Sequence, residues 1–135
     1  MKKVYIAGTI EDRQIPLIIE QLRKRGYEIV SHWHDPGAWM GESRRQVFED
    51  RRALANKNRA DLDQADAVVV STNESSAVQI PLRGAHYEIG YAQGKGIPVF
   101  IFGDHRVLNT MTTGDGSYYG DIREMDRFFA TGATP

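Results

Sequence analysis

Two short runs of consecutive apolar residues constrain the fold more than any other feature of the chain. They are Ala67-Val-Val-Val70 and Val99-Phe-Ile-Phe102. Neither run alternates with polar residues, so a strand formed by either of them has to be buried on both faces. Such strands are typical of parallel sheets, in which helices connect the strands and cover both sides. The sequence therefore predicts an α/β fold built on a parallel sheet.

The beginning of the chain predicts the same architecture. The apolar run 4–7 ends at Gly8 and is expected to form a first strand followed by a turn. Glu11 and Asp12 suit the start of a helix, because the amino-terminus of a helix favours negative charge. The apolar residues with helical spacing in that helix are Ile15, Ile18, Ile19 and Leu22. With a second strand at 27–30, this pattern predicts two parallel strands joined by a right-handed crossover.

The rest of the chain continues the alternation of helices and strands. Residues 42–64 predict a long charged helix, and Ile122, Met125 and Phe129 mark a final helix. The segment 113–120 is rich in turn residues and is expected to be mobile. We expect a single domain over all 135 residues, with four or five strands and helices on both faces of the sheet.

The composition excludes several classes of function. The formal net charge is −1, so the chain offers no broad basic surface for a nucleic acid. It contains no cysteine, which excludes a disulfide framework, a thiol nucleophile and thiolate metal sites, and which agrees with a cytoplasmic location. No apolar run is long enough for a signal peptide or a membrane span. The motifs of P-loops, dinucleotide sites and serine hydrolase elbows are also absent from the sequence.

One acidic residue stands out in the stretch from Arg83 to Pro98, which predicts a helix leading into the strand at 99. Ala85, Ile89 and Ala92 form an apolar stripe on this helix, and Glu88 lies at the edge of the stripe. A carboxylate in that position has lost part of its water. It is either aimed at a ligand or held in a structural ion pair, and spacing alone leaves both interpretations open.

Aromatic and imidazole side chains follow the second predicted strand directly. Ligands of open α/β sheets collect at the carboxyl ends of the strands, so His32, Trp33 and His34 are placed to touch a ligand. Trp33 could instead cover the edge of the core. A metal site at the two histidines would need further ligands that the sequence does not place, so no metal is predicted.

Two polar residues fall on the core-facing line of the long charged helix. Asn58 and Asp61 share that line with Leu54 and Ala65. If the helix is continuous, both polar side chains point inward near its end and need partners or a ligand. If the helix breaks near Asn56, they would cap a second short helix instead.

Four segments together resemble the nucleoside 2-deoxyribosyltransferase-like family, which includes the deoxynucleoside 5'-monophosphate N-hydrolases. They are similar, in order, to the family's first strand and glycine turn, its helix end and third strand, its nucleophile helix, and its segment that reaches a neighbouring subunit. The segments are Val4-Tyr-Ile-Ala-Gly8, 61–70, Gly84 to Pro98, and 106–111. The resemblance implies a Rossmann-like or flavodoxin-like three-layer sandwich that cleaves an N-glycosidic bond without a metal or organic cofactor.

The resemblance also implies roles for particular residues. Glu88 would be the nucleophile that attacks the anomeric carbon, and a second base or water would then release the sugar. Tyr5 would orient Glu88, while Asn58 and Asp61 would meet the sugar and the base. Asn109 would come from another protomer, which requires at least a homodimer. The other residues expected to contact the small-molecule substrate are Gly8, Thr9, Ile10, His32, Trp33 and Gly84.

One position departs from the family pattern. The family usually has an aspartate eight residues before Asp66, where this chain has Asn58. An amide can form hydrogen bonds but cannot transfer a proton. Either Asp61 takes the acid role, or departure of the base is assisted less.

Another position bears on the substrate. The chain resembles both groups of the family, which differ at the position of Asn109. The monophosphate hydrolases carry a serine there, and the nucleoside transferases carry an asparagine, as this chain does. Asn109 therefore favours a nucleoside, whereas Ser75 and Ser76 offer an alternative contact for a phosphate. Three functions stay open: a deoxyribosyltransferase or related N-glycosidase, a nucleoside 5'-monophosphate N-hydrolase, and a non-catalytic nucleotide-binding protein.

Overall fold

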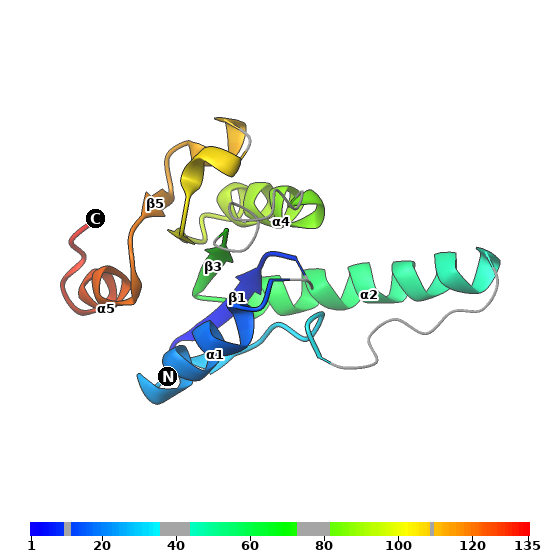
Figure 1. The fold of residues 1–135 in the computed structure, drawn as a ribbon, viewed down its shortest axis with the longest axis horizontal. Coiled ribbons are helices and arrows are strands. Elements are labelled where there is room, and N and C mark those ends of the chain that lie inside the picture. Colours follow the sequence, from blue (N-terminus) through cyan, green and yellow to red (C-terminus); the bar gives the residue numbers. More distant parts are fainter. Residues whose placement is uncertain (10–11, 36–43, 73–81, 109) are drawn as a thin grey trace.

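The computed structural model describes residues 1–9, 12–35, 44–72, 82–108 and 110–135 (Figure 1). At its centre lies a five-stranded sheet with the strand order β2-β1-β3-β4-β5 and parallel pairing throughout. The strands are β1 (Lys3–Ala7), β2 (Glu28–Ile29), β3 (Ala67–Ser71), β4 (Val99–Phe102) and β5 (Ser117–Tyr119). The predicted α/β fold with a parallel sheet is confirmed.

Helices precede or follow each strand. The α-helices of the described ranges are α1 (Ile15–Lys24), α2 (Arg44–Gln64), α4 (Arg83–Gly94) and α5 (Ile122–Thr131). Two 3-10 turns, η1 (His105–Val107) and η2 (Thr110–Thr113), lie between β4 and β5. None of these helices is both long enough and apolar enough to cross a membrane.

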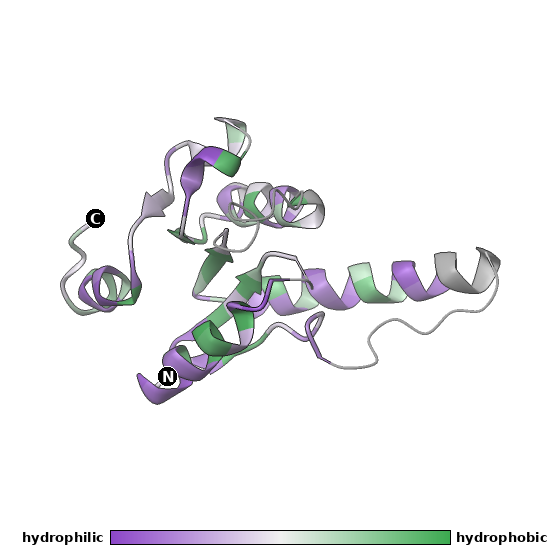
Figure 2. Ribbon diagram, in the orientation of Figure 1, coloured by the Kyte–Doolittle hydropathy of each residue, from purple (hydrophilic) through white to green (hydrophobic). Residues whose placement is uncertain are grey.

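The sheet separates two hydrophobic cores. Tyr5 and Ala7 of β1 pack with residues of α2 and α4, while Val4 and Ile6 pack with residues of α1 and α5. Consecutive residues of a strand point to opposite faces, so residues 4–7 of β1 and all of β3 are buried against one helical layer or the other. Figure 2 shows the result as hydrophobic strands between helices whose outer sides are polar.

The long helix is continuous. α2 runs from Arg44 to Gln64 without interruption, so the alternative of a break near Asn56 is wrong. Its carboxyl-terminal part packs on the sheet through Leu62, and its amino-terminal part projects beyond the sheet (Figure 1). The continuous helix carries Asp61 into the interior, where the residue is only 3% exposed.

The region before α5 differs from its prediction. Residues 113–120 were expected to form only mobile turns, but 117–119 form β5, which pairs with β4 through Val99 and Ser117. The ring of Tyr118 lies 5.5 Å from that of Phe100 and joins the core under α5. A strand of three residues among glycines is too short to produce a hydrophobic pattern, so periodicity cannot predict it.

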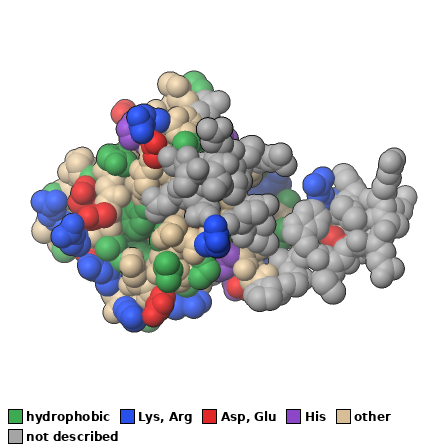
Figure 3. Space-filling model, viewed as in Figure 1, with side chains coloured by type: hydrophobic (Ala, Val, Ile, Leu, Met, Phe, Trp, Pro, Cys, Tyr) green, Lys and Arg blue, Asp and Glu red, His purple; other side chains and the backbone are tan. Residues whose placement is uncertain are grey.

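On the face of the molecule shown in Figure 3, the described charged side chains do not separate by sign. In the view of Figure 3, Lys and Arg side chains lie among Asp and Glu side chains along the described surface. This distribution agrees with the formal net charge of −1.

Candidate active site

The strand order predicts where a ligand would bind to this sheet. The chain leaves β1 toward β2 on one side, and later elements build the sheet on the other side through β3. Open α/β sheets bind ligands at such a switch point, outside the carboxyl ends of the strands. The candidate site therefore lies where β1 and β3 end.

Glu88 and Tyr5 meet near this edge. The Tyr5 hydroxyl donates a hydrogen bond of 2.9 Å to Oε1 of Glu88. The second oxygen, Oε2, is buried and has no hydrogen-bond partner among the described residues. The described part of the chain also provides no salt bridge to Glu88. The carboxyl group is thus held by a neutral donor rather than by a structural ion pair.

Burial changes the acidity of both groups. It raises the pKa of Glu88 to about 8, although the hydrogen bond from Tyr5 opposes part of this change. The pKa of Tyr5 is raised well above its ordinary value by burial, by Glu88 and by Asp61. Tyr5 therefore stays protonated and can only donate to the carboxylate.

Asp61 forms a second buried acidic centre close to Tyr5. Its Oδ2 lies 3.0 Å from Nδ1 of His32, and its Oδ1 lies 3.8 Å from Nζ of Lys57. The His32 side chain is 47% exposed, so its ring keeps an accessible edge. A carboxylate that accepts the Nδ1 proton orients an imidazole and increases the basicity of its other nitrogen.

Three residues singled out from the sequence carry buried polar atoms without partners in the described ranges. Oγ1 of Thr9 and Oδ1 of Asn58 are buried and, within the described ranges, form no hydrogen bond. Oε2 of Glu88 shares this property. Buried polar atoms usually have partners, so these three side chains are suited to bind a polar ligand.

Trp33 and His34 form contacts within the protein. The Trp33 indole N–H donates to the carbonyl oxygen of Ile6 at 2.6 Å, and its ring packs against both cores. His34 Nε2 lies 2.9 Å from Oγ of Ser31, and burial lowers the pKa of His34. Trp33 thus covers the edge of the core, and its contact with a ligand stays a prediction.

A metal centre finds no support in the described side chains. No group of three or more His, Asp or Glu residues is arranged to hold a metal ion in the ranges that the structure describes. The rings of His32 and His34 bond to different partners, Asp61 and Ser31.

The two predicted glycines differ in what surrounds them. A Cβ atom on Gly8 would lie 3.0 Å from Cδ1 of Ile15 and 3.3 Å from the carbonyl oxygen of Ser71, so a glycine lets β1 approach β3 closely. A Cβ on Gly84 would meet no heavy atom of the described structure within 4 Å. Five further residues named from the sequence lie outside the described residues, namely Ile10, Glu11, Ser75, Ser76 and Asn109.

The sequence did not predict the role of Asp12. This residue is 3% exposed, and its Oδ2 accepts a 2.5 Å hydrogen bond from Oγ of Ser71. Its Oδ1 accepts a 2.9 Å bond from the backbone N–H of Gln14, at the start of α1. Because Ser71 ends β3, the pair joins the turn after β1 to the end of β3. In the sequence, the polar residue Ser71 directly after the apolar run 67–70 was the feature that could have indicated this contact at the end of β3.

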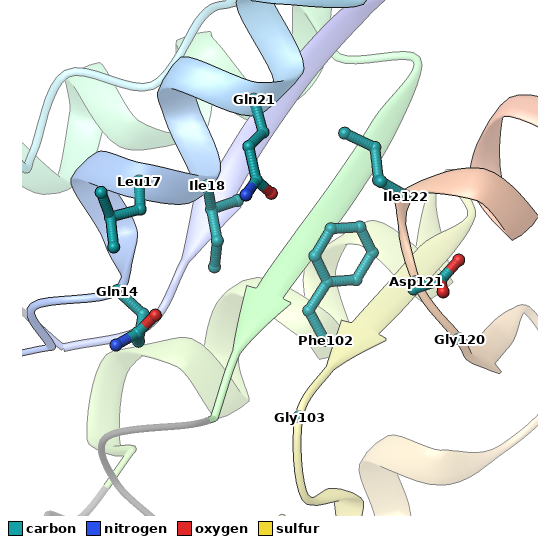
Figure 4. A pocket seen from close by; sticks show the side chains of 9 residues that line it. All are labelled: Gln14, Leu17, Ile18, Gln21, Phe102, Gly103, Gly120, Asp121 and Ile122. Atoms are coloured by element: carbon teal, nitrogen blue, oxygen red, sulfur yellow. The ribbon is translucent and has the colours of Figure 1, made fainter.

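A cavity of about 280 Å³ lies on the other face of the sheet (Figure 4). It lies between α1, the end of β4 and the start of α5. Its lining residues are Gln14, Leu17, Ile18, Gln21, Phe102, Gly103, Gly120, Asp121 and Ile122. Tyr5 belongs to the core under α2 and α4, so this cavity is separate from the Tyr5–Glu88 pair.

Comparison with known proteins identifies the family. The family model described as nucleoside 2-deoxyribosyltransferase matches residues 4–120. The chain belongs to this family. A solved 2-deoxyribosyltransferase from the psychrotolerant bacterium Bacillus psychrosaccharolyticus is 22% identical, with a TM-score of 0.67 over 98% of this chain and 96% of that one. None of the curated proteins compared with the chain matches it significantly.

Membership of the nucleoside 2-deoxyribosyltransferase family indicates an enzyme of that general type. The structural likeness, at this identity, shows the shared fold. The segments from which the resemblance was drawn, between 4 and 111, lie within the matched residues.

Proposed function

We propose that the protein cleaves the N-glycosidic bond of a deoxynucleoside through a covalent bond between the sugar and Glu88. The observation that carries this proposal is the state of the Glu88 carboxyl group. It is buried, it is bonded to the neutral donor Tyr5, and its Oε2 has no partner within the described structure. A partly dehydrated carboxylate held by one donor is suited to attack an electrophilic carbon.

The first half-reaction forms a glycosyl ester. An ionised Glu88 oxygen bonds to C1' of the sugar while the bond from C1' to the base nitrogen breaks, and its electron pair leaves with the base. The sugar passes through an oxocarbenium-like transition state, whose positive charge the carboxylate stabilises. Tyr5 holds the attacking group in place and favours its ionised form.

The departing base takes up a proton. We assign its delivery to the pair of Asp61 and His32, because Asn58 cannot transfer one. An imidazole can exchange protons near neutral pH, and Asp61 holds His32 by its Nδ1. Asn58, whose Oδ1 has no partner in the described ranges, is left to bind a hydroxyl or amino group of the substrate.

The second half-reaction releases the sugar. A second base or a water molecule gives up a proton and attacks C1', the ester bond breaks, and the Glu88 carboxylate is restored. An acceptor base gives a new nucleoside, and water gives the free sugar. We also propose that Asn109 of a neighbouring protomer completes the site, as the family resemblance implies, which makes the enzyme at least a dimer.

The decisive test is a chromatographic assay for free base. The protein is incubated with common deoxynucleosides and their 5'-monophosphates, with and without an acceptor base. Glu88→Gln is expected to lower base release by about 1,000-fold or more, because it removes the nucleophile. The matched control is Glu20→Gln on the exposed side of α1, where the carboxylate pairs with Lys24 at 3.1 Å, and this variant should keep full activity.

Mass spectrometry of acid-quenched protein provides an independent measurement. A deoxyribosyl adduct on the peptide that contains Glu88 would establish the covalent step. Undiminished base release by Glu88→Gln would exclude this mechanism. Ligand-induced thermal stabilisation without any product would instead favour a non-catalytic nucleotide-binding protein.

A further inference from the structure

The backbone of Ile6 in β1 is held on one side by side chains instead of by a neighbouring strand. In a parallel ladder its N–H and C=O groups point toward β2, as those of Val4 do. But β2 is only two residues long, and the N–H of Val30 makes the last bond to the carbonyl oxygen of Val4. The N–H of Ile6 donates instead to Oγ of Ser31 at 3.0 Å, and its carbonyl oxygen accepts from the indole of Trp33 at 2.6 Å. These side chains thus supply the partners that a buried peptide group needs.

The two bonds come from the residues directly before and after His32. Ser31 is only 2% exposed, and the ring of Trp33 packs against both cores. Ile6 is fully buried and pairs with Val69 of β3 on its other side. The chain at His32 is therefore fixed on both sides to the centre of the sheet, while the His32 side chain itself stays about half exposed.

We propose that Ser31 and Trp33 are positioning residues, which hold the imidazole of His32 against Asp61 and keep its Nε2 available to the departing base. This inference rests on the proposed delivery of a proton by His32. Oδ2 of Asp61 lies 3.0 Å from Nδ1 of His32. An ionised carboxylate can only accept, so Nδ1 carries a proton and Nε2 is the atom that exchanges one.

The proton follows one path through the two half-reactions. In the first, the imidazolium of His32 gives its Nε2 proton to the base nitrogen as the bond from C1' to the base breaks, and the ring becomes neutral. In the second, the acceptor base or water gives a proton to Nε2 as it attacks C1', and the imidazolium is restored. Both transfers need Nε2 within hydrogen-bond distance of the base or water, so a ring that turns freely would serve them less well.

Ser31 acts on His32 through the backbone and not through its own hydroxyl. Its Oγ accepts from Ile6 and lies 2.9 Å from Nε2 of His34, so its proton is directed to that nitrogen. Burial lowers the pKa of His34, which keeps this ring neutral and able to accept. The hydroxyl of Ser31 is thus used within the protein, and its effect on the reaction is to fix the chain beside His32.

A purely structural role predicts something different. Ser31 and Trp33 could simply provide partners for a buried peptide group and cover the edge of the core. Their replacement would then lower stability and slow every substrate by the same factor. Positioning of a proton donor predicts a loss that is confined to substrates whose base needs a proton.

The first test compares a purine deoxynucleoside with its N7-methyl derivative, at a pH where the methylated base is a cation. That base leaves as a neutral molecule without taking up a proton. Ser31→Ala should lower kcat by about tenfold or more for the ordinary substrate, and by less than about threefold for the methylated one. Trp33→Phe removes the N–H but keeps an aromatic ring, and it should change the ratio of the two rates in the same direction.

Ser117→Ala is the matched control. Oγ of Ser117 also bonds to the backbone, at 2.8 Å from the carbonyl oxygen of Thr112, but it lies in β5 at the opposite edge of the sheet. Its removal costs a comparable hydrogen bond and should leave the ratio of the two rates unchanged. An equal loss for both substrates in folded Ser31→Ala, or no loss, overturns the inference.

Nitrogen NMR of the histidine rings tests the geometry without a substrate. The chain has four histidines, and the signals that disappear in His32→Gln are those of His32. With the ring neutral, we expect the unmodified protein to carry the His32 proton on Nδ1, and Ser31→Ala and Trp33→Phe each to add a population with the proton on Nε2. A proton on Nε2 in the unmodified protein, or an unchanged ring in the variants, overturns the inference.

Circular dichroism and thermal unfolding show which variants are folded. If Ser31→Ala is not folded, Trp33→Phe decides, and the reverse holds as well. The position of the His32 proton in the unmodified protein is a test that needs no variant.

Failure of the proposed function gives a distinguishable result. If His32→Gln slows both substrates by the same factor, or neither, the proposed proton delivery is wrong. If no base is released from any compound, the proposed reaction is wrong. The NMR measurement then tests Ser31 and Trp33 separately, because a changed His32 ring in their variants supports positioning and an unchanged ring rejects it.

Discussion

At the scale of single residues, the central feature is a carboxyl group whose ordinary acidity is changed by burial. The pKa of Glu88 is raised to about 8, so near neutral pH most of the ligand-free protein carries a protonated Glu88. Only the ionised form can attack the sugar. The value of kcat/KM reports groups of the free enzyme, so it should rise with pH and level off above about 8.

Replacing Tyr5 with Phe should move this pH dependence. The Tyr5 hydroxyl favours ionised Glu88 and lowers its pKa, so Tyr5→Phe should raise that pKa further. The rising limb of kcat/KM should shift up by about one pH unit, with about tenfold less activity at pH 7. Tyr119→Phe, at a tyrosine that is 61% exposed, is the control and should not change the profile. If the rising part of the kcat/KM profile does not shift in Tyr5→Phe, Tyr5 does not lower the pKa of Glu88.

At the scale of elements, α5 stabilises the face of the sheet opposite Glu88. Met125 is fully buried there, beside Phe100 and the rings of Phe128 and Phe129. Met125→Ala should lower the free energy of unfolding by about 2–5 kcal/mol, measured by urea denaturation, because it leaves a cavity. The control Met111→Ala, at a side chain that is 84% exposed, should change it by less than about 0.5 kcal/mol. Specific activity of the folded Met125→Ala protein should be retained, and its loss would show that the two faces are coupled.

The elements also show what the sequence could predict. Long patterns predicted α1, α2, β3 and β4, because the stripes and apolar runs reflect burial directly. β5 was not predicted, because its three residues form a strand by pairing with β4. A local sequence pattern does not encode that pairing. The residues of the candidate site also differ in whether the sequence could predict them. The resemblance named Tyr5 and Glu88, which the fold brings together, but the bond from Ser71 to Asp12 joins residues 59 positions apart and needed the fold.

At the scale of the whole molecule, the proposed site includes a residue of a second chain, Asn109. If Asn109 completes the site of a neighbour, Glu88→Ala and Asn109→Ala should each be inactive alone. Mixing equal amounts and allowing subunits to exchange should restore activity, because one site of each mixed dimer receives both native residues. For a dimer with random exchange, about a quarter of the native activity is expected. Light scattering gives the mass of the assembly, and no recovery in a confirmed oligomer would place Asn109 in its own chain's site.

The position of Trp33 has a practical consequence for detecting substrates. Its ring spans both cores, its indole N–H is fixed by Ile6, and it directly follows His32 in the chain. The chain has two tryptophans, so changing Trp39 to Phe leaves Trp33 as the only one. Its emission depends on the polarity beside the ring, and a nucleoside at His32 would displace water there. The fluorescence of the protein would then serve as an optical gauge of site occupancy, readable without a label or a chemical step.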